Sequence, residues 1–131
     1  MKMIIDKKIL DELTEKAKVN PRLRLAYDLR TCPEEDSQRM LNAIEPGTEI
    51  PIHRHWNSSE TVMCIRGHFQ ECLYDEEGNL EELIDLIPGG AIVNVPVGKW
   101  HNLRSLESGT ILFEAKHGKY EPVRAEDILT I

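Results

Sequence analysis

From Pro33 onward the chain alternates short apolar stretches with glycine-containing turns, and this pattern restricts the fold more than any other feature of the sequence. Apolar and polar residues then follow a period of two, which is the repeat of a β-strand. Many short strands between turns are typical of an all-β sandwich or barrel. The predicted strands cover residues 38–45, 48–55, 59–66, 68–75, 80–86, 91–95, 101–106 and 110–116.

The amino-terminal part has a different period. Apolar residues recur at helical spacing between residues 6 and 19, with lysines and glutamates on the other face. Asp6 is a suitable N-cap, and Asn20-Pro21 ends the helix because proline disfavours the α conformation of the preceding residue. We therefore expect one domain over residues 1–131, with a helical or extended arm at 1–30 and a barrel core at 38–117.

Composition excludes several classes of partner. The formal net charge is −7 and no Lys/Arg cluster is present, so neither nucleic acid nor an anionic membrane surface is expected. No run of 18 apolar residues could span a membrane, and the amino terminus has no signal-peptide pattern. The three cysteines are few and odd in number, which does not fit a disulfide framework. These features favour a cytoplasmic protein.

One motif combines His53, His55 and Glu60. The two histidines are two residues apart, so in a strand both imidazoles point to the same side. Glu60 follows a short turn and can return a carboxylate to that side. Two imidazoles and one carboxylate suit a divalent Zn, Fe, Mn, Co or Ni ion.

A second motif ends at His101, which follows a turn at Pro96-Val97-Gly98. From the opposite side of a barrel, His101 could supply a third imidazole to the same ion. Three histidines and one glutamate leave two positions of an octahedral ion open for water, substrate or dioxygen. The sequence thus predicts one divalent transition metal, of undetermined identity, bound by four side chains.

These two motifs resemble the conserved motifs of the cupin superfamily. The resemblance includes Gly47 and Gly67 around the first motif, and Gly90, Pro96 and Gly98 before His101. It implies an all-β double-stranded β-helix, or jelly-roll barrel, and it implies that His53, His55, Glu60 and His101 bind the metal. Ser105 departs from the family pattern, which usually has an asparagine that is not a metal ligand.

A narrower resemblance covers nearly the whole chain. Residues 18–24, 38–47 and 113–120 resemble the WbuC family of cupin fold metalloproteins, which is associated with bacterial surface-polysaccharide gene clusters. This resemblance supports the fold and the metal, and it implies no particular reaction.

Further polar residues are candidates for a substrate pocket. Arg39 and Asn42 could bind an anionic or hydroxylated substrate, or they could be outward polar positions of a half-buried strand. Glu114 and Lys116 share a strand face and could form either a site pair or an exposed ion pair. Tyr120 could lie at the pocket edge.

Glu71 is the candidate acid or base. If residues 60–73 form a hairpin with a two-residue turn at Arg66-Gly67, Val62 faces Glu71, and cross-strand partners share a face. Glu60 must point inward to reach the metal, so Val62 and Glu71 would point inward too. Burial would raise the pKa of Glu71, as a general acid or base requires. A bulge at Gly67 would instead send Glu71 to solvent.

The expected function is a metal-dependent enzyme acting on a small polar metabolite or sugar derivative. Ferrous iron would favour an oxygenase, whereas zinc or manganese would favour an isomerase, epimerase or hydrolase. The alternatives are a non-catalytic saccharide-binding or sensor module and, least favoured, a structural metal. A homodimer is expected from the helix's apolar stripe and the outward parity of Ile52, Trp56 and Trp100.

Overall fold

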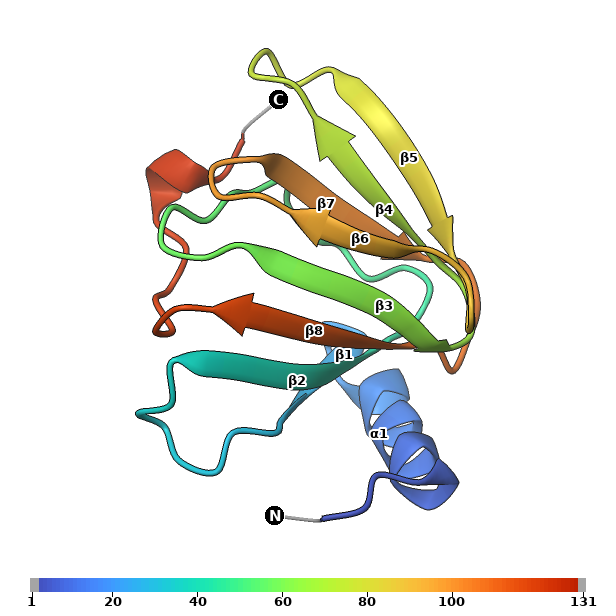
Figure 1. The fold of residues 1–131 in the computed structure, drawn as a ribbon. Coiled ribbons are helices and arrows are strands. Elements are labelled where there is room, and N and C mark those ends of the chain that lie inside the picture. Colours follow the sequence, from blue (N-terminus) through green and yellow to red (C-terminus); the bar gives the residue numbers. More distant parts are fainter. Residues whose placement is uncertain (1–2, 130–131) are drawn as a thin grey trace.

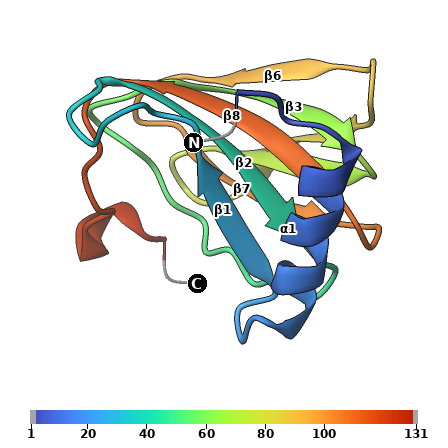
Figure 2. The same ribbon diagram turned by 90° about the horizontal axis from the view of Figure 1, so that it is seen from below.

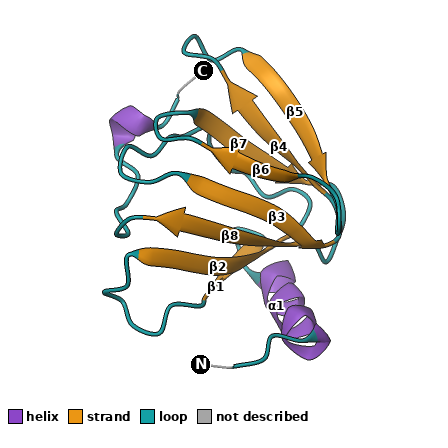
Figure 3. Cartoon of the chain, viewed as in Figure 1, coloured by secondary structure: helices purple, strands orange, loops and turns teal. Residues whose placement is uncertain are grey.

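The computed structural model describes residues 3–129, which form two antiparallel β-sheets and one amino-terminal helix (Figures 1 and 3). Residues 1–2 and 130–131, which the predicted single domain includes, lie outside this range. The elements are α1 (Lys7–Val19), β1 (Arg24–Asp28), β2 (Ser37–Ile44), β3 (Glu60–Arg66), β4 (Phe69–Tyr74), β5 (Leu80–Leu86), β6 (Ile92–Val95), β7 (Trp100–Ser105), β8 (Ile111–His117) and the 3-10 helix η1 (Ala125–Asp127).

The two sheets make the walls of a jelly-roll barrel, which confirms the all-β fold class. One sheet has five strands in the order β1-β2-β8-β3-β6, and the other has three in the order β5-β4-β7. Sequence neighbours β3 and β4 lie in different sheets, as do β6 and β7. Within the described range, no helix is long and apolar enough to cross a membrane.

Helix α1 lies against the five-stranded sheet, beside β1 and β2 (Figure 2). The Asp6 side chain caps it by accepting a hydrogen bond from the Ile9 amide. Arg66, at the end of β3, holds the helix by donating hydrogen bonds to Asp11 and Thr14. The apolar stripe packs on the outer face of the sheet, in a cluster formed by Ile9, Leu13, Ala17, Leu41, Ala43 and Ile111.

The helix therefore covers its stripe within one chain, which removes one reason for expecting a homodimer. Ile52 and Trp100, whose outward parity was the other reason, are buried inside the protomer and offer no exposed surface for a partner. Trp56 alone of the three is exposed. The homodimer stays a prediction, to be tested by the molar mass in solution.

Two predicted strand boundaries differ from the structure. Residues 24–28, assigned to an arm, form β1 and pair with β2. Residues 48–55, expected to be a strand, are irregular, and His53 alone in this segment forms β-bridges. Pro51 contributes to this because proline has no amide hydrogen for a sheet hydrogen bond.

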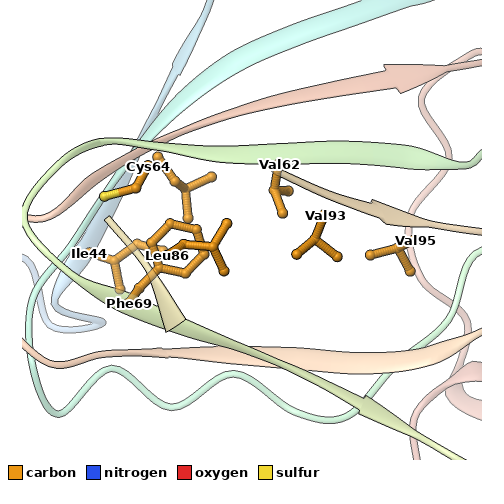
Figure 4. Packing of buried hydrophobic residues seen from close by; sticks show 8 residues of the cluster. Ile44, Val62, Cys64, Phe69, Leu86, Val93 and Val95 are labelled. Carbon is orange, nitrogen blue, oxygen red and sulfur yellow. The ribbon is translucent and has the colours of Figure 1, made fainter. Parts of the chain in front are cut away.

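The barrel interior is apolar at one end (Figure 4). Ile44, Cys64, Phe69 and Leu86 are grouped there, and Val62, Val93, Val95 and Leu112 complete the buried cluster. Along β3 the inward positions run from Cys64 through Val62 to Glu60, all buried. The packed core thus fills one end and leaves the other for polar side chains.

The predicted hairpin between β3 and β4 is wrong. β3 pairs with β6 and β8, whereas β4 pairs with β5 and β7. The chain passes from one sheet to the other at Gly67, where φ is +86°. The inward direction of Glu71 nevertheless agrees with the prediction, because the inner faces of both sheets meet in the barrel.

Candidate metal centre

The two histidine motifs meet through a backbone bridge. The His53 amide donates to the His101 carbonyl at 3.0 Å, and the His101 amide donates to the His53 carbonyl at 2.9 Å. This pairing places the imidazoles side by side, with ring centroids 4.3 Å apart. The His55 ring lies 5.0 Å from the His53 ring. The irregular segment before β3 therefore brings together the histidines that the sequence assigned to one site.

Backbone carbonyls fix the orientation of two of these rings. His53 Nδ1 lies 2.8 Å from the Pro51 carbonyl, and His101 Nδ1 lies 2.8 Å from the Lys99 carbonyl. A carbonyl only accepts hydrogen bonds, so each Nδ1 must carry the proton. The Nε2 lone pair is then free, which is the arrangement of histidines that bind a metal through Nε2.

Glu60, the first residue of β3, directs its carboxylate between the rings. Its Oε1 lies 3.1 Å from His101 Nε2, and its Oε2 lies 3.7 Å from His55 Nε2. Among the described residues, Glu60 Oε2, His55 Nε2 and His101 Nε2 are buried without a hydrogen-bond partner. Buried polar atoms are normally paired, so this group of orphaned ligand atoms is unusual.

These spacings fit a divalent metal ion. The available ligand atoms of His53, His55 and His101 all lie within 4.8 Å of one another. Two ligand atoms that are each about 2.1 Å from one ion, at right angles, are about 3.0 Å apart. The 3.1 Å between Glu60 and His101 matches this separation, and shared coordination would satisfy the orphaned atoms. The three histidines thus form one ligand group, whereas Glu60 is grouped with His101 and Glu71 and approaches His55 at 3.7 Å. The four-ligand metal site stays a prediction.

The protonation states of His53, His55 and Glu60 in the metal-free site favour a cation, whereas Glu60 outweighs burial and raises the pKa of His101. Burial lowers the pKa of His53 and of His55 to about 4, so both imidazoles are neutral at neutral pH. Burial alone would raise the pKa of Glu60, but His101 and Lys116 outweigh it and hold the pKa below its ordinary value. Neutral imidazoles and an ionised carboxylate are the forms that coordinate a metal.

Glu71 is buried inside the barrel, as predicted. It is fully inaccessible, and its carboxylate oxygens have no hydrogen-bond partner among residues 3–129. Burial raises the pKa of Glu71 well above its ordinary value, and the negative charges of Glu60 and Glu114 raise it further. Its ligand atom lies within 4.8 Å of those of Glu60 and His101. Glu71 does not line the adjoining cavity, so it could act on a ligand only through these neighbours.

The cavity beside the histidines has a volume of ≈ 370 Å³, within the range of small-molecule sites. Asn42, Glu114, Lys116 and Tyr120, four of the predicted pocket residues, line it. Lys116 Nζ lies 3.8 Å from Glu60 Oε2 and 3.6 Å from Glu114 Oε1. All three side chains are mostly buried. Burial and the charge of Glu60 raise the pKa of Glu114.

Arg39 does not belong to this cavity, so its predicted place in the pocket is wrong. On β2 the side chains of Met40, Asn42 and Ile44 face the cavity. The Arg39 side chain points to the opposite side of β2, the same side as Leu41, which packs under the helix. Arg39 forms a salt bridge with Glu35 at 2.9 Å.

Among the residues that sequence reasoning missed, two are charged: Arg22 and Arg24 line the cavity. They belong to the segment that begins β1, which was assigned to an arm. The signal that could have identified them is the alternation of Arg24, Ala26 and Asp28 with the apolar Leu25 and Tyr27.

Comparisons with known proteins agree with this architecture. One solved structure, KdgF from Halomonas sp., has a TM-score of 0.62 at 19% identity over 78% of this chain and 85% of that chain. Oxalate oxidase in complex with glycolate has a TM-score of 0.67 at 13% identity, over 82% of this chain and 57% of that chain, so this chain spans little more than half its length. A cupin 2 domain-containing protein from Halorhodospira halophila has a TM-score of 0.62 at 18% identity, over 77% and 68% of the two chains.

At these identities the structural similarity establishes the fold, and no curated protein matches the sequence. The sequence model of one family, described as Domain of unknown function (DUF6016), matches residues 5–86, which is more than half of the chain. The chain therefore has the cupin fold and belongs to the DUF6016 family.

Proposed function

We propose that this protein is a metal-dependent cupin enzyme that acts on a small polar metabolite or sugar derivative. The observation that carries the proposal is the set of orphaned, buried ligand atoms of His55, Glu60 and His101. Of these residues, Glu60 and His101 line a cavity of ≈ 370 Å³. His53, His55, Glu60 and His101 would hold one divalent ion. A bound divalent ion would act as a Lewis acid on a substrate oxygen.

The chain's own residues supply the remaining functions. Glu114 lines the cavity and has a raised pKa, so it can hold and return a proton there. Lys116 lies between Glu114 and Glu60 and can stabilise negative charge on either carboxylate. Asn42 and Tyr120 can donate hydrogen bonds to hydroxyl groups of a substrate. Isomerisation or epimerisation needs this kind of proton transfer; an oxygenase reaction would depend on iron.

Four features favour a small polar or sugar-like substrate. The volume excludes a polymer chain held along its length, and the lining combines charged groups with amides and a phenol. The resemblance to the WbuC family supports a role in bacterial surface-polysaccharide biosynthesis. One structural neighbour, oxalate oxidase, binds glycolate, which is a small hydroxy acid.

A non-catalytic sensor or saccharide-binding module is the second candidate. The position of Glu71 favours it, since the predicted acid or base does not reach the cavity. A binding module needs only the metal, the cavity shape and hydrogen-bond donors.

The test begins with elemental analysis of protein purified without added metal. Metal-loaded protein is then incubated with sugar nucleotides and sugar acids, while proton NMR in D₂O follows isomerisation and an oxygen electrode follows oxygen uptake. Turnover that His101→Ala abolishes supports the enzyme. Metal-dependent binding without turnover supports the module, and protein with no bound transition metal overturns both.

A further inference from the structure

Two arginines line the cavity at the sheet edge opposite the candidate metal centre. Arg24 opens β1 and pairs with Ile44, whose side chain faces the cavity, and Arg22 precedes it. β2 and β8 lie between β1 and Glu60 on β3. With neighbouring strands about 4.8 Å apart, the β1 backbone lies roughly 14 Å from β3, measured across the sheet. Along the strands, Arg24 is level with Ile44, whereas Glu60 is level with Gln38, six residues earlier on β2.

The backbone between the arginines is held in an uncommon conformation. Leu23 has φ = 56°, and it is the one non-glycine residue with positive φ in the described part of the chain. Its carbonyl accepts hydrogen bonds from the Glu45 amide and from Thr48 Oγ1, both at 2.9 Å. The Asn20 side chain accepts another from the Arg22 amide at 2.8 Å. A left-handed leucine persists only where its surroundings enforce it, and such positions concentrate at ligand sites.

Neither arginine has an acidic partner among the described residues, and Arg22 is exposed while Arg24 is partly buried. Lys116, the third basic group of the lining, already lies near Glu60 and Glu114. Within residues 3–129, neither Arg22 nor Arg24 forms a salt bridge, although the chain has 23 acidic residues and 16 basic ones. A planar guanidinium presents a fork of donors that matches a carboxylate or a phosphate.

We propose that Arg22 and Arg24 form an oxyanion-binding subsite, so that the small molecule bound in the cavity carries a carboxylate or phosphate group at this end. The inference rests on the proposed function for the opposite end of the ligand, where a hydroxyl or carbonyl oxygen would meet the metal. The arginine subsite itself needs no metal, which makes the two proposals separable.

The test compares three probes that share one ring: glucose, glucuronate and glucose 6-phosphate. Isothermal titration calorimetry at low ionic strength measures their binding to wild-type protein, both zinc-loaded and treated with chelator. The variants are Arg22→Gln, Arg24→Gln and the double variant. Arg104→Gln is the matched control, because it removes one positive charge from the exposed face of β7, where Arg104 donates to Gln70. Circular dichroism verifies that each variant is folded.

We expect glucuronate or glucose 6-phosphate to bind at least about tenfold more tightly than glucose, as hydrogen bonds to charged groups imply. Arg24→Gln and the double variant should remove this preference, whereas Arg104→Gln should retain it. The stronger of the two anionic probes identifies the group as carboxylate or phosphate. Equal binding of all three probes, no binding of either anion, or an anion preference that survives in the folded double variant would overturn the subsite. If the double variant is unfolded, Arg24→Lys replaces it, and an unchanged anion affinity in that variant would overturn the bidentate contact.

The chelator-treated protein separates this outcome from the metal proposal. Anion preference that persists without metal supports the arginine subsite even if the protein binds no transition metal. Loss of the preference in Arg24→Gln with full zinc occupancy shows that the arginines act independently of the ion. An anion preference that His101→Ala removes and Arg24→Gln retains would assign the anion to the metal end and overturn the subsite.

Discussion

Glu60 Oε1 and His101 Nε2 lie 3.1 Å apart across the barrel, and His101 Nε2 has no hydrogen-bond partner among the described residues. The carboxylate comes from the five-stranded sheet and the imidazole from the three-stranded sheet. The His101 ring is already oriented by its Nδ1 contact with the Lys99 carbonyl. The two sheets thus present opposite ligand types to one point, which explains why a metal site can be made from motifs 41 residues apart in sequence, at Glu60 and His101.

The first prediction concerns this pair. Protein purified without added metal should contain about one divalent transition metal ion per chain, as measured by inductively coupled plasma mass spectrometry. His101→Ala should weaken metal binding by more than the roughly 10–100-fold seen when only a ligand's hydrogen-bond partner is removed. The control is His117→Ala, which changes an exposed histidine. Full metal occupancy of His101→Ala under a competing chelator would show that the four-ligand assignment is wrong.

The second prediction concerns Glu71. Glu71→Gln keeps the shape of a buried side chain whose carboxylate has no partner among the described residues, and it removes the ionisable group. We expect unchanged metal content. If removing the buried ionisable group stabilises the metal-free protein by about 1 kcal/mol, its melting temperature at neutral pH should rise by roughly 3–6 °C. Differential scanning calorimetry measures the shift, with Glu49→Gln as the exposed control.

Two other outcomes for Glu71→Gln carry different meanings. Loss of the metal would show that Glu71 is itself a ligand or directly supports one. A lower melting temperature with the metal retained would show that the carboxylate is stabilised in the folded protein, contrary to its lack of hydrogen-bond partners.

The four residues of the candidate metal centre were accessible from the sequence because each of their two motifs is local. His53 and His55 lie two residues apart, and Glu60 and His101 each follow a turn marked by its own residues. The inward direction of Glu71 was also predictable, because side chains along each strand point alternately into and out of a barrel. The predicted β3–β4 pairing was wrong since period and turn residues do not distinguish a hairpin from a crossing between two sheets.

The anion subsite was not accessible in the same way. Arg22 and Arg24 become part of the cavity only through the pairing of β1 with β2, which no local pattern specifies. Arg39 was assigned to the pocket because its strand was identified without knowing which face looks inward. A one-residue change of parity moves a side chain to the other face, and only tertiary contacts decide it.

The third prediction uses two glycines with positive φ. At Gly67 a Cβ atom would lie 2.7 Å from Thr110 Cα and would clash with Thr110 Oγ1, whereas at Gly89 it would meet nothing within 4 Å. Gly89→Ala should therefore cost only the left-handed backbone, about 1 kcal/mol. Gly67→Ala adds a clash and should cost about 2–4 kcal/mol. Urea unfolding of both variants measures the difference, and equal losses would show that Thr110 moves aside freely.

The last prediction concerns Asp127 and pH. Asp127 Oδ1 accepts hydrogen bonds from Arg54 Nε at 3.1 Å and from Trp56 Nε1 at 2.9 Å, which ties η1 to the segment that carries His53 and His55. Burial would raise the pKa of Asp127, but the bonds from Arg54 and Trp56 outweigh it and lower the pKa below 3.8.

A carboxyl group with a lowered pKa in the folded state stabilises the protein above its unfolded pKa, and this contribution disappears as the pH falls through the folded value. Asp127→Asn should therefore lower the melting temperature at pH 7, and the difference from wild type should shrink as the pH falls below about 4. Glu126→Gln, on the exposed side of the same 3-10 helix, should leave the melting temperature nearly unchanged at both pH values. A deficit in Asp127→Asn that is as large at pH 3 as at pH 7 would mean that the side chain acts through its shape and neutral hydrogen bonds, and that its charge contributes nothing to holding η1 against the histidine segment.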